Sequence, residues 1–214
     1  MIISQRENDF DIIIIGGGGC GLSAAITATE AGASCMVLEA DTKLGGATGL
    51  SAGVVYAADT SVQRAAGVEG DTAQAMYDYV MTLAGWEANP KIVRILSDHS
   101  GPAVEWLIRQ GVEFPPEYLL CSGVDTVPRG HPSLGIADPL INAAGAKGVE
   151  VALDTRVESL IYEEGNVVGV RASGTRGSTS STSRAALSTL RRVPQLGQNP
   201  LLLQENATRR SWWQ

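Results

Sequence analysis

The stretch DIIIIGGGGCGLSAAITATEAGASCMVLE, residues 11–39, decides the fold of this 214-residue chain. Its β-branched run at 12–15 predicts a strand covered on both faces. The alanine-rich residues 24–31 predict a helix, and residues 34–38 predict a second apolar strand. Strand, glycine turn, helix and strand in this order predict a βαβ unit, and therefore an α/β fold with a parallel sheet.

The glycine turn indicates a nucleotide pocket. Gly16, Gly18 and Gly21 stand in G-x-G-x-x-G spacing between the strand and the helix. The first glycine permits a sharp turn, the second lets the backbone approach a pyrophosphate, and the third lets the helix pack closely on the strand. Glu39 follows Gly21 by 18 residues, near the distance at which a carboxylate reaches a ribose diol. A βαβ unit that binds nothing is the alternative, and the proper context of the glycines disfavours it.

A second glycine-rich stretch distinguishes FAD from NAD. Residues 39–53, EADTKLGGATGLSAG, place paired glycines shortly after the acidic strand end. Together with the first turn, this stretch resembles the flavoprotein family of fumarate reductase and succinate dehydrogenase, which includes the 3-ketosteroid dehydrogenases. The resemblance implies FAD as the cofactor and disfavours an NAD-dependent enzyme.

The resemblance also implies which residues hold the cofactor. Small and hydroxyl residues after the paired glycines would wrap the pyrophosphate and the isoalloxazine ring, and the backbone at Val157 would meet the adenine. Members with covalent flavin carry a histidine where this chain has Ala47, so we expect non-covalent FAD. The expected cofactor-binding residues are Gly16, Gly18, Gly19, Cys20, Gly21, Glu39, Ala40, Lys43, Gly45, Gly46, Ala47, Thr48, Ser51, Ala52, Gly53 and Val157.

Residues 89–100 and 103–111 resemble the paired helices of the family. Asn89 is the expected N-cap of the first helix, with Pro90 at its first helical position. The apolar face of this helix is expected to comprise Ile92, Val93, Ile95 and Leu96.

His131 is the expected substrate contact. It lies in the loop VPRGHPS, residues 127–133, which resembles a fumarate reductase segment whose histidine contacts the substrate carboxylate. An imidazole suits this task because it donates a hydrogen bond or a positive charge near neutral pH. An ordinary loop histidine is the alternative. The stretch that follows, residues 134–138, is shorter than in fumarate reductases, which weakens the expectation of a dicarboxylate substrate.

The rest of the chain completes the expected fold. Residues 139–147 predict a helix, 149–153 a strand, and 155–162 with 167–171 a β-hairpin. The expected class is α/β, a Rossmann-like FAD-binding domain with a parallel central sheet, a helical insertion and a β-hairpin. We expect this domain, residues 1–174, to be incomplete, with the family's capping domain absent.

Composition changes abruptly after Gly174. Residues 175–214 carry six Arg against one Glu, a net charge of +5, whereas residues 1–174 carry −12. A basic arm for nucleic acid or an anionic membrane is one interpretation. We favour a separate Ser/Thr/Arg-rich tail in which the reading frame is disturbed across about 175–196, and we expect no nucleic-acid partner.

The composition otherwise predicts a globular protein. Hydrophobic residues make up 44% of the chain, and no apolar run approaches the ~20 residues that span a bilayer. Residues 1–9 are polar and predict no secretory signal, so the cytoplasm is the expected location. Cys20, Cys35 and Cys121 are isolated thiols, which predicts a reducing compartment and no metal.

The expected activity follows from the family resemblance. It implies an FAD-dependent oxidoreductase that transfers a hydride between flavin N5 and a carbon–carbon bond of a small-molecule substrate. That substrate would be an unsaturated carboxylate or a 3-ketosteroid. The alternative is a truncated, catalytically inactive flavin-binding fragment. The sequence does not predict an oligomeric state.

Overall fold

The computed structural model describes residues 10–164, 166–174 and 177–188. It opens with the predicted βαβ unit, namely strand β1 (Phe10–Ile15), helix α1 (Gly19–Glu30) and strand β2 (Cys35–Leu38). β1 and β2 pair in parallel. The predicted order of elements is confirmed, and α1 begins inside the glycine turn rather than after it.

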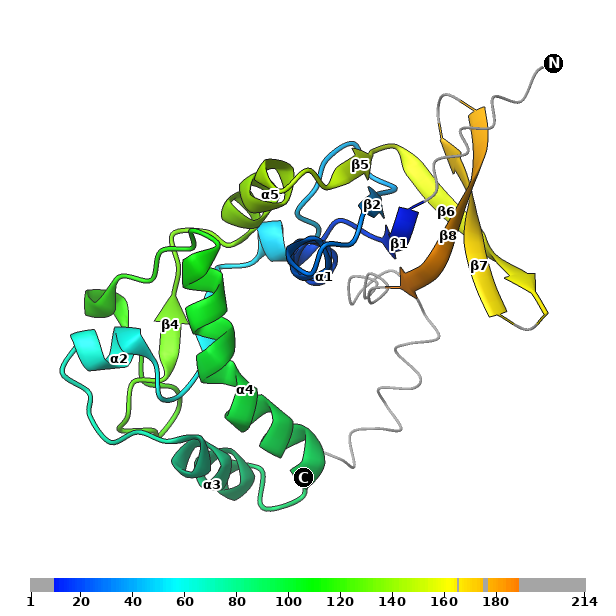
Figure 1. Ribbon diagram of the computed structural model, residues 1–214. Coiled ribbons are helices and arrows are strands. Elements are labelled where there is room, and N and C mark those ends of the chain that lie inside the picture. The colour runs from blue at the N-terminus through cyan, green and yellow to red at the C-terminus, as the bar shows by residue number, and fades with distance from the viewer. Residues whose placement is uncertain (1–9, 165, 175–176, 189–214) are drawn as a thin grey trace, which may run out of the picture.

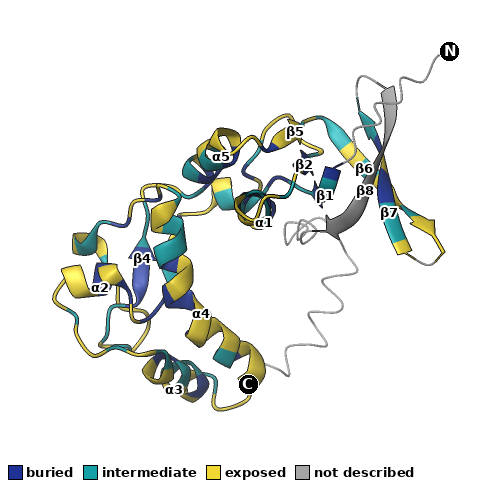
Figure 2. Ribbon diagram, viewed as in Figure 1, coloured by how far each residue is buried: buried dark blue, intermediate teal, exposed yellow. Residues whose placement is uncertain are grey.

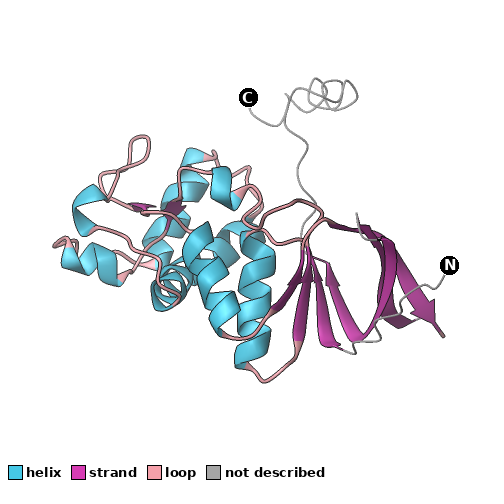
Figure 3. Ribbon diagram, turned by 90° about the horizontal axis from the view of Figure 1, so that it is seen from above, coloured by secondary structure: helices cyan, strands magenta, loops and turns pink. Residues whose placement is uncertain are grey.

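One six-stranded sheet forms the body of the molecule, in the order β5-β2-β1-β8-β7-β6 (Figure 3). The other strands are β5 (Glu150–Ala152), β6 (Thr155–Glu163), β7 (Asn166–Gly174) and β8 (Gly177–Ser188). β5, β2, β1 and β8 run parallel, while β6 and β7 form the predicted antiparallel hairpin beside β8. The α/β class with a parallel centre is therefore confirmed.

Both faces of β1 are covered, as its β-branched run predicts. Ile13 belongs to one buried cluster, with Phe10, Leu38, Val170 and Ala172. Ile14 belongs to a second cluster, which α1 and α5 (Ala137–Ala146) complete. Successive strand residues point to opposite faces, so a segment covered on both faces needs apolar side chains at consecutive positions, as at residues 12–15.

The helical insertion forms a lobe beside the sheet (Figure 1). It has its own core, built around Ala57, Val62, Val104, Val112 and Phe114. In chain order its elements are the 3-10 turn η1 (Thr48–Leu50), β3 (Val54–Tyr56), α2 (Ser61–Ala65), α3 (Ala73–Leu83), α4 (Pro90–Arg109), the 3-10 turn η2 (Pro116–Tyr118) and β4 (Gly130–Pro132). β3 and β4 pair in an antiparallel two-stranded sheet.

The two helices expected between residues 89 and 111 are one helix, α4. The expected cap is present, because the Asn89 side chain accepts hydrogen bonds from the backbone of Lys91 and Ile92. The helix continues through Pro102 because tertiary packing outweighs the propensity of proline to end a helix. At Gly101 the helix touches its neighbour so closely that an added Cβ would lie 2.5 Å from the Ala58 carbonyl oxygen.

The expected apolar face of α4 is mostly uncovered. Val93 is buried, whereas Ile92, Ile95 and Leu96 are 65%, 61% and 48% exposed. The helix instead packs through a stripe that includes Ser97, Ser100 and Gly101. Figure 2 shows the half of α4 nearest α3 as largely exposed.

Part of the expected tail lies in the sheet. β8 falls within residues 175–214 and pairs with both β1 and β7. Residues 175–176 and 189–214 lie outside the described residues, and they include residues 189–196 of the expected frame-disturbed segment. Within the described part of the chain, no helix is both long and apolar enough to cross a membrane.

Candidate nucleotide site

Two glycines of the first turn are required by the fold. Gly16 has a φ of +100°, a conformation that side chains disfavour. Its N–H donates to the Leu38 carbonyl at 2.8 Å, which ties the turn to β2. At Gly21, an added Cβ would lie 1.9 Å from the Gly16 carbonyl oxygen. The backbone of α1 therefore passes too close to the turn for any side chain at this position.

Gly18 is a glycine that the fold does not require. It precedes α1 with φ −79° and ψ −177°, a conformation open to any residue. The nearest atom to an added Cβ is the Gly45 carbonyl oxygen at 4.0 Å, so the protein leaves room for a side chain. A glycine in such a place leaves the backbone open to close approach by a ligand.

Glu39 is fixed in orientation beside this turn. One carboxylate oxygen accepts a hydrogen bond from the Gly17 N–H at 2.7 Å, and the other accepts one from the Asp41 N–H at 2.8 Å. A carboxylate offers about four acceptor positions, so Glu39 retains capacity for ligand hydroxyl groups. Strand β6 begins next to it, because the Thr155 N–H donates to the Glu39 carbonyl at 2.8 Å. Val157 is two residues further along β6, and its side chain is half-buried.

The loop of residues 45–53, termed the glycine loop below, runs across the amino terminus of α1. The Gly45 N–H donates to the Gly17 carbonyl at 2.9 Å, and Gly45 forms an isolated parallel bridge with Gly18. The Thr48 hydroxyl accepts from the Gly19 N–H at 3.2 Å. The first N–H groups of a helix lack partners within the helix and carry a partial positive charge, so they suit an anion.

The structure brings most of the expected cofactor residues together around the start of α1. The glycine turn contacts both Glu39 and the glycine loop. Solvent-exposed members of the set are Cys20, Ala40, Lys43, Gly46, Ala47, Ser51 and Ala52. The arrangement is an open surface of backbone N–H groups and small side chains, flanked by one carboxylate.

His131 is placed differently. It is 0% exposed, and both ring nitrogens are bonded inside the protein, Nδ1 to the Arg129 carbonyl and Nε2 to the Thr60 hydroxyl, each at 2.7 Å. The carbonyl only accepts, so Nδ1 carries the proton and Nε2 accepts from Thr60. Burial lowers the pKa of His131, which keeps the ring neutral. In this arrangement both ring nitrogens of His131 are bonded inside the protein. The residue is buried on β4, so it is not the ordinary loop histidine of the alternative, and substrate contact stays a prediction.

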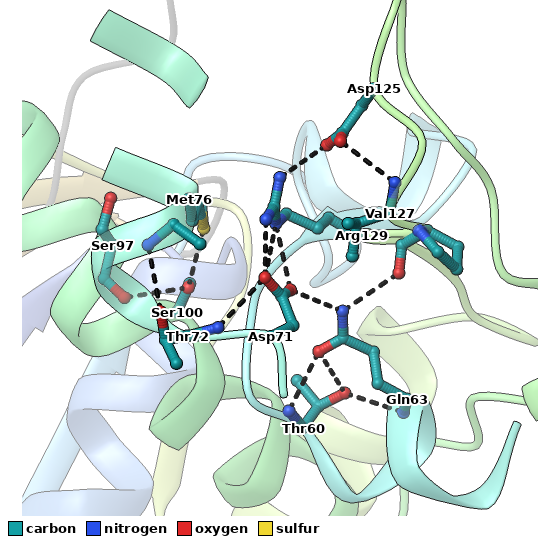
Figure 4. A network of polar contacts seen from close by, with 12 residues as sticks. Thr60, Gln63, Asp71, Thr72, Met76, Ser97, Ser100, Asp125, Val127 and Arg129 are labelled. Atoms are coloured by element: carbon teal, nitrogen blue, oxygen red, sulfur yellow. Dashed lines mark hydrogen bonds and ion pairs between the residues drawn. The ribbon is translucent and has the colours of Figure 1, made fainter. Parts of the chain in front are cut away.

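A buried polar network centres on Arg129, the residue before β4, and includes Asp71, Asp125 and Gln63 (Figure 4). The Arg129 guanidinium, 3% exposed, contacts Asp71 at 2.5 Å and Asp125 at 2.7 Å. The Tyr56 hydroxyl donates to Asp125 at 2.7 Å, and the Gln63 amide donates to Asp71 at 2.8 Å. Together these contacts join β3, α2 and the residue before β4 to the segment before α3.

The ion pairs of this network set its charge state. Burial alone would lower the pKa of Arg129, but the hydrogen bonds and charge of Asp71 and the other partners raise it above its usual value. Burial alone would raise the pKa of Asp125, but hydrogen bonds from Tyr56 and Val127 and the nearby Arg129 lower it. Both groups are therefore charged at neutral pH.

The sequence did not indicate the network or the hydrogen bond from Ser133 to Gly53. Asp71 and Asp125 are 58 and 4 residues from Arg129, and no residue spacing predicts that they meet. Ser133 lies two residues after His131, and its hydroxyl donates to the Gly53 carbonyl at 2.8 Å. Pro128 and Pro132 in residues 127–133 are the sequence signal that indicates a restricted backbone in this loop.

Comparison with known proteins places the chain among flavoproteins. The family model described as "FAD binding domain" matches residues 11–208. Fumarate reductase (cytochrome) of Shewanella frigidimarina is 29% identical over 181 residues, 81% of this chain and 31% of that protein. Urocanate reductase of Eggerthella lenta is 31% identical over 174 residues, 78% and 28% of the two chains.

A solved structure gives the same result. The 3-ketosteroid-delta4-(5alpha)-dehydrogenase of Rhodococcus jostii RHA1, in complex with 4-androstene-3,17-dione, superposes with a TM-score of 0.76 at 27% identity. The match covers 87% of this chain and 46% of that one. This chain therefore spans a third or less of the curated relatives, at 31% and 28%, and under half of this structure.

Proposed function

We propose that this chain, which belongs to the FAD binding domain family, binds FAD non-covalently and forms the flavin-binding part of an FAD-dependent oxidoreductase. The chain is similar to reductases of fumarate and urocanate and to a ketosteroid dehydrogenase. Bound FAD would supply hydride transfer to or from a carbon–carbon bond. The chain's own residues would hold and orient the cofactor.

Gly18 is the observation that carries the proposal. The fold accepts a side chain at this position, because an added Cβ would meet no protein atom closer than 4.0 Å. The glycine leaves a cradle at the amino terminus of α1, where a pyrophosphate fits the helix N–H groups. The residues present therefore fit the cofactor that the family name specifies.

The neighbouring residues extend this fit to the rest of the dinucleotide. Glu39, held by two backbone N–H groups, would accept hydrogen bonds from the ribose hydroxyls. The glycine loop would lie along the pyrophosphate and the ring end of the flavin. Ala47 is exposed and has only a methyl group, which supports non-covalent attachment.

The substrate side favours an uncharged molecule. Val54 and Pro132 are register partners in the β3–β4 sheet, so they share a face, while His131 points to the opposite, buried face. Val54 and Leu120 are each 49% exposed, and the adjacent Arg129 is already paired with two carboxylates. A carboxylate placed here would lose hydration without gaining a cation. A ketosteroid-like ring is therefore the first candidate, and an unsaturated carboxylate the second.

A flavin-binding piece without turnover is the alternative function. The chain spans 31% of the fumarate reductase that it matches, and its buried histidine and arginine are both engaged in internal contacts. Under this proposal the protein binds FAD, and neither His131 nor Arg129 is free to contact a substrate.

A visible spectrum and two assays test these proposals. Purified protein that is yellow, or that takes up added FAD and releases it on acid denaturation, supports non-covalent binding. Colourless protein that takes up no FAD refutes it. Loaded protein is then assayed with a 3-ketosteroid and an oxidised dye, and with fumarate and a reduced dye. Turnover of either substrate contradicts the alternative, and turnover of fumarate alone contradicts the preference for an uncharged substrate.

A further inference from the structure

The carbonyl of Gly53 ends the glycine loop and receives two hydrogen bonds from one residue. Ser133 donates to it through Oγ at 2.8 Å and through its backbone N–H at 3.1 Å. The same hydroxyl accepts from the Gly135 N–H at 3.3 Å. The donor and acceptor capacity of this side chain is thus used to join the loop to the end of β4.

We propose that Ser133 is a positioning residue that fixes the glycine loop against a bound flavin. This inference rests on the proposed function, because it assigns a role in the same site. Nothing in the sequence pattern or in the family resemblance assigns a role to this serine.

The element that carries Ser133 is itself held rigidly. His131 is buried, with both ring nitrogens bonded, and Arg129 is bonded to the carboxylates of Asp71 and Asp125. These contacts hold His131 and the residue before β4, two and four positions before Ser133. Because buried, fully satisfied polar networks restrict local motion, Ser133 lies on a fixed support.

From Gly53, hydrogen bonds continue back through the glycine loop to helix α1. The Gly53 N–H donates to the Ser51 hydroxyl at 3.2 Å, and that hydroxyl donates to the Thr48 carbonyl at 3.0 Å. The Thr48 hydroxyl accepts from the Gly19 N–H at 3.2 Å. The loop is therefore tied at one end to the amino terminus of α1 and at the other end to Ser133.

The conformation of Gly53 leaves room beside it for the Ser133 hydroxyl and for little else. Gly53 has a φ of +68°, and an added Cβ would lie 2.5 Å from Ser133 Oγ but 3.8 Å from Ser133 Cβ. The hydroxyl thus fills the space beside Gly53. Without it, the carbonyl keeps only the backbone bond from residue 133, and the loop gains freedom next to the flavin.

The test uses the full chain loaded with FAD and three variants. Ser133→Ala removes the hydroxyl and Ser133→Thr retains it. Ser159→Ala is the matched control, because Ser159 is an exposed serine on β6. We measure FAD affinity, the visible bands and midpoint potential of bound flavin, and the urea unfolding of the flavin-free chain.

We expect Ser133→Ala to weaken FAD binding roughly 3- to 10-fold, the factor for one lost hydrogen bond, and to shift the flavin bands and potential. Ser133→Thr should restore them, while Ser159→Ala changes nothing. A Ser133→Ala protein with the flavin affinity and spectrum of the control would overturn the inference while leaving FAD binding intact. Failure of the unchanged chain to bind FAD overturns the proposed function, and this inference with it.

A second pair of variants tests the same contact independently of the change in FAD affinity in Ser133→Ala. Gly53→Ala brings a methyl group against Ser133 Oγ, and Gly53→Ala combined with Ser133→Ala removes that contact. We expect the double variant to bind FAD more tightly than Gly53→Ala alone. Equal affinities in the two proteins would show that the hydroxyl does not control the loop.

Discussion

Gly18 and Gly21 belong to one motif, but Gly21 is required by packing and Gly18 by the proposed ligand. Alanine substitutions at the two positions distinguish these reasons. In Gly21→Ala the new Cβ lies 1.9 Å from the Gly16 carbonyl oxygen, 1.1 Å inside the 3.0 Å at which atoms must shift. The obstacle is backbone, so α1 has to move away from the turn. Overpacking of this severity costs about 3 kcal/mol in the free energy of unfolding.

Gly18→Ala should leave the fold unchanged. Alanine restricts the unfolded chain, which stabilises by about 0.4–1 kcal/mol, but it is a poorer N-cap than glycine by a similar amount. The net change is within about 0.5 kcal/mol. The Cβ instead occupies the cradle for the pyrophosphate. A contact of this kind costs about 2 kcal/mol of binding free energy, which raises the Kd for FAD roughly 30-fold.

Urea unfolding of the flavin-free proteins and quenching of FAD fluorescence measure the two effects independently. We expect Gly21→Ala to lose stability and Gly18→Ala to lose only affinity. The reasoning is refuted if Gly18→Ala unfolds as easily as Gly21→Ala, or if it binds FAD as tightly as the unchanged protein.

Three further predictions concern the insertion. Arg129→Met leaves the Asp71 carboxylate, 3% exposed, without its cation and should cost about 3–5 kcal/mol in urea unfolding; a loss below about 1 kcal/mol contradicts a buried charge. Burial lowers the pKa of His131, so the unfolded chain binds more protons below about pH 6.5 and stability falls as the pH drops through that value. Urea midpoints at about pH 7.5 and about pH 5.5 should differ less in His131→Gln. Val93→Ala should cost about 1–2 kcal/mol and Ile92→Ala under about 0.5 kcal/mol, because these residues are 6% and 65% exposed; equal losses would show that the exposed face is covered.

The βαβ unit was predictable because its signals are local. The apolar run before Gly16 and the spacing to Glu39 depend only on neighbouring residues. The Asn89 cap was predictable for the same reason, since the side chain bonds to residues two and three positions later.

Features that depend on distant contacts were not predictable. Proline and glycine at 101–102 indicated a helix end, but close packing of Gly101 on Ala58 keeps α4 continuous. His131 has the residue type of a substrate contact, and its Nε2 is bonded to Thr60, 71 residues earlier. The partners that decide such features are far away in sequence.

The register of β1 constrains the order in which the chain folds. Its partner on one side, β2, is made soon afterwards, but the partner on the other side, β8, pairs Phe10 with Ser183. During synthesis, one edge of β1 therefore stays unpaired until some 170 further residues have been made. Pairing across such a separation is slow, and an open apolar edge favours association with other chains. We therefore expect the nascent protein to depend on chaperones more than a fold with neighbouring strands.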